Sequence, residues 1–433
     1  MKLFPHQEAA LQSTEGQNRV AYYLDMGLGK TFLGSEKAVK MGSKIILVVC
    51  QKSKVQDWID HFAEHYMIGD IDKSLYPRDL TVKSEFENFL VHVNEVQDGS
   101  RYVGVINYDL IWRRKILLNL KNFTLVLDES SLIQNRKSNR SKFILKMEPE
   151  NVVLLSGTPT GGKYENLWTQ LHLLGWDISE NLYNAQYVNW KNIKVGGMVH
   201  KIVNKDDPYK NVERLKQKMR EHGAVFMKTE DVFDLPEQNF INVSVPTTKE
   251  YKKFKKDQVV TVNGGEFVGD SLLSFRLYQR QLCTAYNPNK VDAFKDILDS
   301  TQDRLIVFYQ FNCELDVLVA ACKDAERPYS IISGHHKDLT AYETESNSVT
   351  LVQYQAGAMG LNLQKANKIV YFSLTESAEI WMQAHKRIHR IGQKKPCFYY
   401  ILVCKDSIEE RILDCLNRGV DYTDDLFRKE DEN

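Results

Sequence analysis

The stretch DMGLGKT, residues 25–31, decides the fold predicted for this chain. A glycine-rich turn leaves backbone N–H groups free to surround phosphates, and the helix after it directs its positive N-terminal end toward them. In such a turn Lys30 reaches the β- and γ-phosphates of ATP, and the Thr31 hydroxyl binds Mg²⁺. The strict phosphate-binding loop has a glycine where this chain has Leu24, so the motif is a variant.

The second motif is LVLDES, residues 125–130, an apolar run that ends in two carboxylates. Such a strand end is the usual position of a magnesium-binding aspartate and of a glutamate that orients water. Asp128 is the candidate metal ligand, and Glu129 is the candidate general base. A strand that ends in Asp-Glu is also common as a solvated turn or a helix cap. The catalytic interpretation therefore depends on the phosphate-binding loop upstream.

Two further motifs indicate a function only in combination with the first two. LSGTPT, residues 155–160, places small and hydroxylated residues at a strand end, where they could relay the state of the γ-phosphate; a plain Gly-Pro loop is the alternative. In QAHKRIHRIGQ, residues 383–393, Arg387 and Arg390 share one helix face or helix end. Two guanidiniums can stabilise charge on a transferred phosphoryl group, whereas an isolated basic cluster is more often a solvated helix.

Apolar, β-branched runs in both halves of the sequence indicate parallel sheets. They show little polar alternation, which is typical of strands covered on both faces by helices. The predicted strands are KIILVV (44–49), YVGVI (102–106), FTLVLD (123–128), NVVLLSG (151–157), RLIVFY (304–309), SVTLVQY (348–354) and KIVYF (368–372), and the last stretch adds a strand and a closing helix. Between the two groups, from about 180 to 300, charged helical sequence predominates. Its basic clusters at 211–220 and 250–256 fit a DNA-clasping insertion and a solvated linker equally well.

The composition describes a soluble globular protein of two or three domains. The chain has 433 residues, of which 43% are hydrophobic and 26% charged. The 57 basic and 57 acidic residues cancel, so a nucleic-acid binder of this balance must concentrate positive charge on one face. Seven cysteines without a CxxC pair disfavour a zinc site or a disulfide framework. We find no signal peptide and no membrane-spanning run, and we expect a cytoplasmic protein, in the host cytoplasm if the chain is phage-encoded.

The order and spacing of the motifs resemble a superfamily-two helicase core, specifically its SWI/SNF-type DNA translocase branch. The pair MGLGKT and RIHRIGQ is the most specific part of this resemblance. The other matching segments are LFPHQ (3–7), LVVCQKSKVQDW (47–58), VINYDL (105–110), LDES, LSGTPT, FMKTEDVFDLPE (226–237), IVFYQF (306–311) and QAGAMGLNLQKAN (355–367). The resemblance implies two RecA-like parallel-sheet lobes in tandem, a helical insertion between them, and ATP in the cleft between the lobes.

The resemblance also assigns residues to roles. The catalytic set is Lys30, Asp128, Glu129, Arg387 and Arg390, and Thr31 and Asp128 are the ligands of Mg²⁺. The residues expected to contact ATP are Gln7, Gly27, Gly29, Lys30, Thr31, Gly360, Arg387 and Arg390. The residues expected to contact DNA, mainly through its phosphates, are Lys52, Ser53, Trp58, Asn107, Gln355 and Asn362.

The chain departs from the family pattern in three places. Its second motif reads DES where the family has DEAH or DEGH, so the histidine that couples hydrolysis to DNA is replaced by Ser131 or omitted. Gln355 stands where an arginine is common, which puts one DNA or nucleotide contact in doubt. The segment FSLTES, residues 372–377, replaces the usual Trp-Asn-Pro sequence. The compact chain resembles a phage or prokaryotic member more than a chromatin remodeller.

We therefore expect an ATP-dependent translocase that tracks 3′ to 5′ along one strand of duplex DNA. A strand-separating or branch-migrating helicase, or the motor subunit of a larger DNA-processing or defence complex, shares every motif. A nucleic-acid-binding scaffold with a degenerate ATP site disagrees with the complete catalytic set. The expected domains are an ATP-binding lobe at 1–180, a helical insertion and linker at 181–300, and a second lobe at 301–433. The sequence leaves protein partners and oligomeric state open, and a monomer is one expectation.

Overall fold

The computed structural model describes residues 2–67, 75–95, 101–195, 197–334, 336–357 and 361–427. The chain divides into two compact units, Met1–Val232 with Asp421–Asn433, and Phe233–Val420. The three-part division into 1–180, 181–300 and 301–433 stays a prediction. None of the helices in the described residues combines the length and the hydropathy that a bilayer-spanning helix requires.

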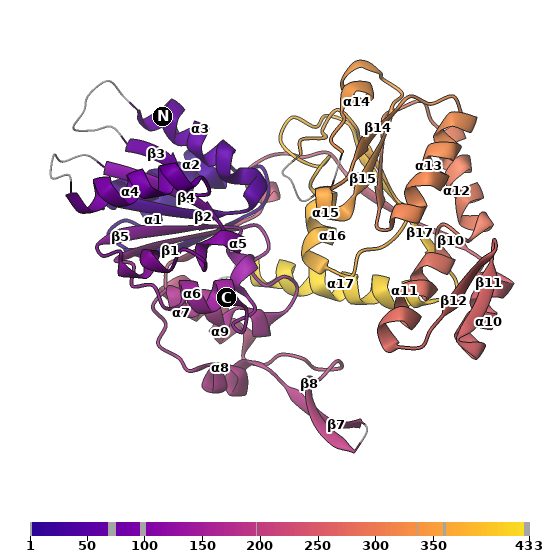
Figure 1. Cartoon of the computed structure of the whole chain (residues 1–433), viewed down its shortest axis with the longest axis horizontal. Coiled ribbons are helices and arrows are strands. Elements are labelled where there is room, and N and C mark those ends of the chain that lie inside the picture. The colour runs from indigo at the N-terminus through magenta and orange to yellow at the C-terminus, as the bar shows by residue number, and fades with distance from the viewer. Residues whose placement is uncertain are drawn as a thin grey trace. The chain divides into compact units, whose positions relative to one another are not determined.

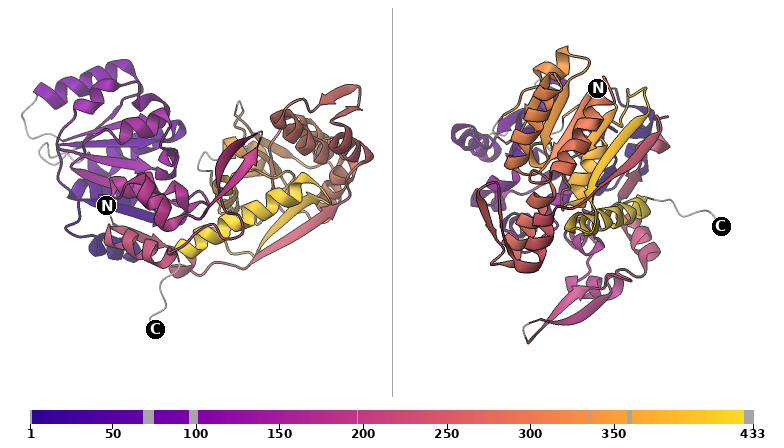
Figure 2. Two further views of the ribbon diagram at one scale, coloured as in Figure 1. Left: turned by 90° about the horizontal axis from the view of Figure 1, so that it is seen from below. Right: turned by 90° about the vertical axis from the view of Figure 1, so that its right-hand side faces the viewer.

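The first unit is built on a parallel sheet of seven strands in the order β3-β4-β2-β5-β6-β1-β9. Its strands are β1 (Arg19–Leu24), β2 (Ile45–Cys50), β3 (Leu75–Asp79), β4 (Arg101–Asn107), β5 (Phe123–Asp128), β6 (Asn151–Ser156) and β9 (Ala224–Met227). Strands β2 and β6 are buried along their whole length, because helices cover both faces of the sheet (Figures 1 and 2).

The helices of the first unit connect these strands. They are α1 (Pro5–Ser13), α2 (Lys30–Lys40), α3 (Val55–Tyr66), α4 (Lys83–Glu95), α5 (Tyr108–Ile111), α6 (Asn139–Ile144), α7 (Trp168–Leu173), α8 (Glu180–Tyr187) and α9 (Val212–Glu221). Helix α2 begins directly after Gly29, which takes the left-handed conformation with φ 72°. Glycine adopts this conformation without steric cost, so the DMGLGKT turn can end and a helix can begin within one residue.

The second unit contains a parallel sheet of six strands in the order β10-β17-β16-β13-β15-β14. Its strands are β10 (Gln238–Val245), β13 (Leu305–Tyr309), β14 (Tyr329–Ile332), β15 (Val349–Gln353), β16 (Lys368–Tyr371) and β17 (Cys397–Cys404). Its helices are α10 (Lys249–Asp257), α11 (Leu272–Cys283), α12 (Pro288–Asp299), α13 (Asn312–Asp324), α14 (Thr340–Thr344), α15 (Tyr354–Gly357) and α16 (Ala378–His385), and α17 (Ile408–Phe427) follows β17.

Two antiparallel hairpins lie outside the sheets. One is formed by β7 (Trp190–Val195) and β8 (Met198–Val203) in the first unit, and the other by β11 (Val259–Val262) and β12 (Gly265–Val268) in the second. Both fall in the range for which the sequence predicts charged helices. That range does contain helices, but its lysine-rich sequence also forms strands.

The sequence prediction of two parallel α/β units is confirmed. Each predicted strand is present, with ends shifted by no more than about one residue, and β17 and α17 form the expected final strand and helix. The prediction did not include β1, β3, β9, β10 or β14. Strand β1 lies inside the sheet, between β6 and β9, so the sequence prediction left out one of the strands on which the site is built.

Candidate functional site

Three neighbouring strands of the first sheet bring the predicted motifs to one edge. Strand β6 pairs in parallel with β1 on one side and with β5 on the other. In this register Tyr23 lies opposite Ser156, and Asp128 lies opposite Leu155. Because the carboxyl ends of parallel strands meet at one edge, DMGLGKT, LDES and LSGTPT all begin there.

The Lys30 ammonium lies within this group of loops. Its Nζ donates to the carbonyl oxygens of Leu24, at 2.8 Å, and Asp25, at 3.2 Å. A Cβ added to Gly157 would lie 3.4 Å from this Nζ and 3.4 Å from the Leu24 carbonyl oxygen. Gly157 of the third motif therefore lies directly beside the ammonium. The structure thus brings the first and third motifs together.

Gln7 ties helix α1 to the glycine-rich turn. Its side chain is buried, and its Nε2 donates to the Leu28 carbonyl oxygen at 3.0 Å. A Cβ at Gly29 would lie 2.2 Å from the same Nε2, so the absence of a side chain there lets the amide reach the turn. In this arrangement Gln7 supports the phosphate-binding turn. Its recognition of adenine remains a prediction.

Asp128 is held in place from two sides. Trp58 of α3 donates from Nε1 to Oδ2 of Asp128 at 2.9 Å, and the Tyr108 hydroxyl donates to its backbone carbonyl at 3.0 Å. Burial raises the pKa of the Asp128 carboxyl, while the Trp58 hydrogen bond and the charges of Lys30 and Lys54 favour its ionised form. A carboxylate and a hydroxyl are hard oxygen donors of the kind that Mg²⁺ prefers, so the chemistry of Asp128 and Thr31 suits that ion, and their role as its ligands stays a prediction.

Glu129 adopts a left-handed backbone, with φ 53° and ψ 59°. This conformation is uncommon for a residue other than glycine, and it is found mainly where the surrounding structure imposes it. The Ser156 hydroxyl contacts Glu129 Oε2 at 3.4 Å and accepts a hydrogen bond from the Thr158 backbone N–H at 3.1 Å. The second and third motifs are therefore linked through Ser156.

Gln170 of α7 is a residue that the sequence analysis missed. Its side chain has 0% exposure, and its Oε1 accepts hydrogen bonds from the Ser130 hydroxyl at 2.7 Å and the Tyr23 hydroxyl at 3.1 Å. Its Nε2 donates to the Pro159 carbonyl oxygen at 2.7 Å. One buried amide thus joins the loops of the second and third motifs to β1. The sequence signal that could have identified Gln170 is a glutamine on the face of a short helix whose other residues on that face are buried.

In the second unit, the two predicted arginines have different environments. Arg387 has 2% exposure, and its guanidinium donates to the Leu361 carbonyl oxygen at 3.3 Å. Arg390 is half-buried, and burial lowers the pKa of its guanidinium, which stays charged. Within the residues that the structure describes, the Arg390 guanidinium has no hydrogen-bond or ion-pair partner. Arg390 is therefore the arginine that can reach a ligand without breaking an existing contact.

Hydrogen bonds attach the segment around these arginines to the loop before β16. The Gln393 side chain donates to the carbonyl oxygens of Gln364, at 3.1 Å, and Ala366, at 2.8 Å. The Leu363 N–H donates to the Arg387 carbonyl oxygen at 3.3 Å. Hydrogen bonds thus connect the segment 355–367 to the segment 383–393. Gly360, which is predicted to contact nucleotide, lies outside the described residues.

The residues predicted to contact DNA divide by exposure. Lys52 and Ser53 are exposed on a 3₁₀ turn, Lys52–Lys54, after β2, and Gln355 and Asn362 are exposed in the second unit. Trp58 and Asn107 have 1% and 7% exposure. Both side chains are therefore interior in this conformation, and the Trp58 ring supports Asp128 instead of offering a surface to DNA.

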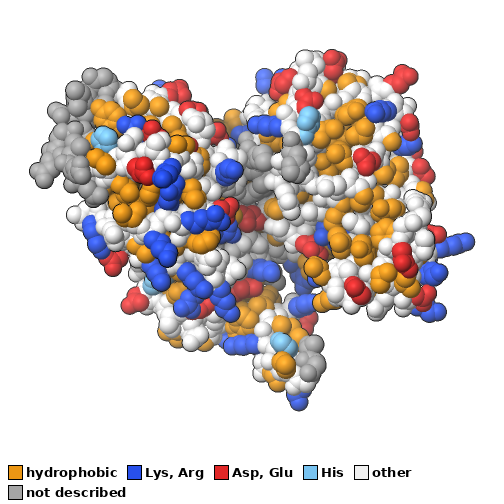
Figure 3. Space-filling view, in the orientation of Figure 1, with side chains coloured by type: hydrophobic (Ala, Val, Ile, Leu, Met, Phe, Trp, Pro, Cys, Tyr) orange, Lys and Arg blue, Asp and Glu red, His pale blue; other side chains and the backbone are white. Residues whose placement is uncertain are grey.

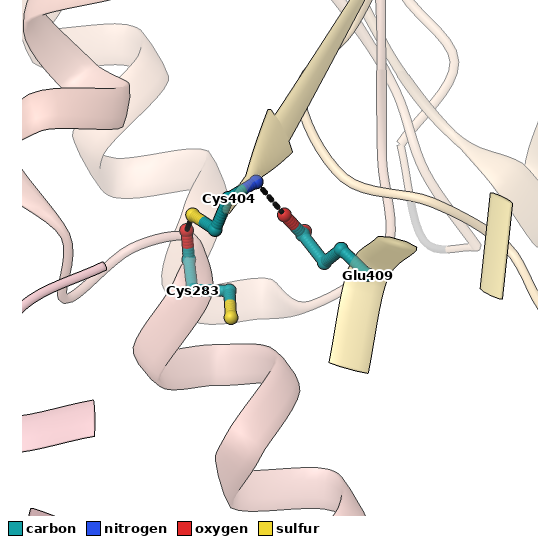
Figure 4. A group of neighbouring side chains, drawn as sticks. All are labelled: Cys283, Cys404 and Glu409. Atoms are coloured by element: carbon teal, nitrogen blue, oxygen red, sulfur yellow. Dashed lines mark hydrogen bonds between the residues drawn. The ribbon is translucent and has the colours of Figure 1, made fainter. Parts of the chain in front are cut away.

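Among the described residues, one group has the spacing of a metal site. Cys283, Cys404 and Glu409 place their ligand atoms within 4.8 Å of one another (Figure 4). The Lys290 ammonium, however, donates to both Glu409 oxygens, at 2.7 and 2.8 Å, and all four side chains are buried. Burial also raises the pKa of the Cys283 thiol, which disfavours the thiolate that a metal requires. Lys290 already supplies the positive charge in this cluster.

Comparison with known proteins identifies the family. The model of the SNF2-related domain matches residues 23–287, which is more than half of the chain. The chain belongs to the SNF2-related domain family. The helicase conserved C-terminal domain matches residues 289–392. The resemblance inferred from the motifs is therefore confirmed at the level of the family.

Curated relatives share this family at low identity. The mouse SWI/SNF-related matrix-associated actin-dependent regulator of chromatin subfamily A member 1 is 24% identical over 90% of this chain and 40% of its own length. The ISWI chromatin-remodeling complex ATPase ISW1 of Saccharomyces cerevisiae is 24% identical over 92% of this chain and 38% of its own length. The chain therefore spans about two fifths of the length of these relatives.

A solved structure, the Sulfolobus solfataricus SWI2/SNF2 ATPase core in complex with double-stranded DNA, is also similar. It is 18% identical, and the superposition covers 98% of this chain and 93% of that chain with a TM-score of 0.44. The fold of the present SNF2-family chain is established by its own two parallel sheets, and its family by the match over residues 23–287.

We predict that Gln170→Leu destabilises the first unit. The change removes a buried acceptor from the Ser130 hydroxyl and a donor from the Pro159 carbonyl, and unsatisfied buried groups of this kind cost about 1–3 kcal/mol each. Urea denaturation measures the loss. Ser130→Ala should cost less in the Gln170→Leu background than alone. Gln12→Leu, at an exposed position on α1, is the matched control, and equal stabilities for the two leucine variants would contradict the network.

Proposed function

We propose that this SNF2-family chain is an ATP-driven motor that moves along double-stranded DNA and hydrolyses ATP faster when DNA is bound. The observation that carries the proposal is the meeting of Lys30, Asp128 and the Glu129–Ser156 contact at one edge of the first sheet. A phosphate-binding lysine, a magnesium-binding carboxylate and a candidate base are the groups that hydrolysis of ATP requires.

Each residue of this edge has a proposed task. Backbone N–H groups at the start of α2 and the Lys30 ammonium bind the phosphates, and Gln7 keeps the turn in shape. Asp128 and Thr31 would hold Mg²⁺, which would supply positive charge against the phosphates of ATP. Glu129 accepts a proton from the attacking water. Trp58 and Gln170 are proposed as positioning residues, since Trp58 hydrogen-bonds to Asp128 and Gln170 joins the loops after β5 and β6.

Arg390 is proposed to add positive charge to the transferred phosphoryl group. Its charge is permanent, and no partner among the described residues holds it. This is the task that an arginine finger performs, and its removal typically slows hydrolysis by a factor of about 10³–10⁵. Arg387, buried and bound to the Leu361 carbonyl, is proposed to hold the segment that presents Arg390.

The DNA contacts are proposed to be made mainly to phosphates. Lys52, Ser53, Gln355 and Asn362 are the exposed candidates. Binding through phosphates predicts an affinity that falls steeply with salt and shows little sequence preference. The pair MGLGKT and RIHRIGQ favours duplex DNA over RNA as the substrate. Stimulation of phosphate release by duplex DNA, single-stranded DNA and RNA, compared side by side, tests this assignment.

Translocation and strand separation require separate assays. Displacement of a third strand from a triplex reports movement along a duplex, whereas opening of a forked duplex reports unwinding. We expect triplex displacement without efficient fork opening. Efficient opening of the fork would favour the strand-separating or branch-migrating helicase, and ATPase activity without either result would favour a motor that needs a further protein.

Replacement of Lys30 by alanine is predicted to abolish hydrolysis. The change removes the ammonium beside the phosphates, and removal of one such stabilising group slows turnover by a factor of about 10²–10³. DNA-stimulated phosphate release measures the effect. Lys40→Ala, on the same helix but exposed and paired with Glu36, is the control. A Lys30→Ala variant with parental ATPase activity would remove the phosphate-binding assignment.

Glu129→Gln is predicted to preserve ATP binding and to stall turnover. Glutamine has the same size and can keep the contact with Ser156, but it cannot accept the proton. Nucleotide affinity is measured with a fluorescent ATP analogue, and turnover is measured under single-turnover conditions. Glu148→Gln, at an exposed site on the same unit, is the control. Ordinary turnover in Glu129→Gln would mean that another residue is the base.

Arg390→Ala is predicted to lose turnover with only a modest drop in nucleotide affinity and with an unchanged melting temperature. Arg387→Ala should instead lower the melting temperature, because it removes a buried, hydrogen-bonded side chain. Thermal unfolding and steady-state kinetics separate the two effects. An unchanged rate in Arg390→Ala would contradict the proposal that residues of both units act in one reaction.

A further inference from the structure

We infer that the β7–β8 hairpin is a separate nucleic-acid-binding element, which contacts the phosphate backbone on both sides of a groove. The hairpin projects from the body of its own unit (Figures 1 and 2). It is a two-stranded antiparallel ribbon, and no other strand of the described residues pairs with it. None of the motifs discussed above includes it.

The charged residues of the hairpin are all basic. Residues 181–205 contain no Asp or Glu, although a segment of this length would hold about three at the average acidic content of the chain. The ribbon carries Lys191, Lys194 and Lys201, here called the ribbon lysines, together with His200, and all four are exposed. No carboxylate among the described residues forms an ion pair with a ribbon lysine. Lysines without neighbouring acids are complementary to a polyanion.

The strand register places this charge on both faces of the ribbon. Lys194 lies opposite Val199 and Lys201 lies opposite Asn192, which puts these two lysines on the face of Trp190. Lys191 and His200 lie on the other face, opposite Ile202 and Ile193. A flat contact with one surface would use only one of these faces. A groove bounded by two phosphate strands uses both, and the major groove of duplex DNA, about 12 Å wide, admits a two-stranded ribbon.

The end of the ribbon is apolar and open to solvent. Met198 and Val199, which follow the turn, have 69% and 60% exposure, among the largest values for apolar side chains in the first unit. Figure 3 shows hydrophobic side chains at the surface of this projecting element. A two-stranded hairpin alone is only marginally stable in water. Base edges or sugars would cover these apolar side chains once the ribbon entered a groove.

The base of the hairpin is firmly attached, so the element has a defined position on its unit. The Asn189 N–H donates to the Pro208 carbonyl oxygen at 2.8 Å, and the Asn189 side chain donates to Asp207 at 3.0 Å. Tyr209 stacks on Tyr164 with ring centroids 4.6 Å apart. The first acidic residues after the ribbon, including Asp207, therefore lie at this base, and the projecting part stays purely basic.

The inference rests on the proposed function only in naming nucleic acid as the ligand. Its test is the triple variant Lys191→Ala/Lys194→Ala/Lys201→Ala of the full chain. Binding is measured without ATP by fluorescence anisotropy, over a range of salt, with duplex DNA, single-stranded DNA and RNA as separate probes. Removal of each phosphate contact should lower the slope of log affinity against log salt by about 0.9, so the loss of three contacts should weaken duplex binding about 500-fold at about 0.1 M salt.

A control variant has the same change of charge. Lys40, Lys83 and Lys121 are exposed lysines of the same unit, and each is already paired with a glutamate. Their triple alanine variant should keep the parental affinity and salt slope. Melting temperatures of the two triple variants establish that both are folded. Equal weakening by both variants would show a general charge effect and overturn the assignment to the hairpin.

Photocrosslinking gives a second measurement that is independent of affinity. A p-benzoyl-phenylalanine introduced at Val199 should crosslink to labelled duplex DNA, whereas the same group at Leu182, exposed on α8, should not. If the parental chain binds DNA and the ribbon-lysine variant shows the same affinity and slope, the inference fails while the proposed function stands. If the parental chain binds none of the three probes, both fail. Preference for single strands over duplex would overturn the groove geometry.

Discussion

The parallel pairing of β6 with β1 and with β5 is the constraint on which the rest of the site depends. The three strands are interior to their sheet, and their side chains alternate between two buried faces. A slip of one residue in either pair would turn every side chain of the strand to the opposite face and disrupt the close packing on both, so the shapes of the core side chains fix the register. The same register sets Asp128, Ser156 and the turn after Leu24 beside one another. Core packing thus determines where the polar groups meet.

Buried polar side chains then orient the loops that leave these strands. Trp58 and Tyr108 fix Asp128, and Gln170 joins the loops after β5 and β6. A hydrogen bond in a water-poor interior has greater directional strength, and an unmade one has a larger cost. The second motif lacks the histidine usual in its family, and the chain here joins its second and third motifs through Ser130 and the amide of Gln170.

The sequence predicted most of the strands that are apolar over their whole length, such as β5 and β6, because burial on both faces leaves a continuous hydrophobic run. It missed β1, although residues 20–24 of that strand are equally buried. It missed β9 and β14, which have four residues each, and β10, whose side chains are largely exposed or half-buried. The charged motifs of both units were found because phosphate chemistry demands particular residue types. Gln170 could not be found this way, since its partners are up to 147 positions distant along the chain. Trp58 was assigned to DNA, although its apolar stripe with Phe62 already indicated the core.

The left-handed backbone at Glu129 has a consequence for the evolution and engineering of the chain. A glutamate in this conformation carries strain of roughly 1–3 kcal/mol that asparagine or glycine would largely relieve. Selection for heat resistance alone should therefore replace Glu129 by asparagine or glycine, with loss of the carboxylate. Because the Glu129 carboxylate is the candidate base, stabilisation of this protein by substitution should leave that position unchanged.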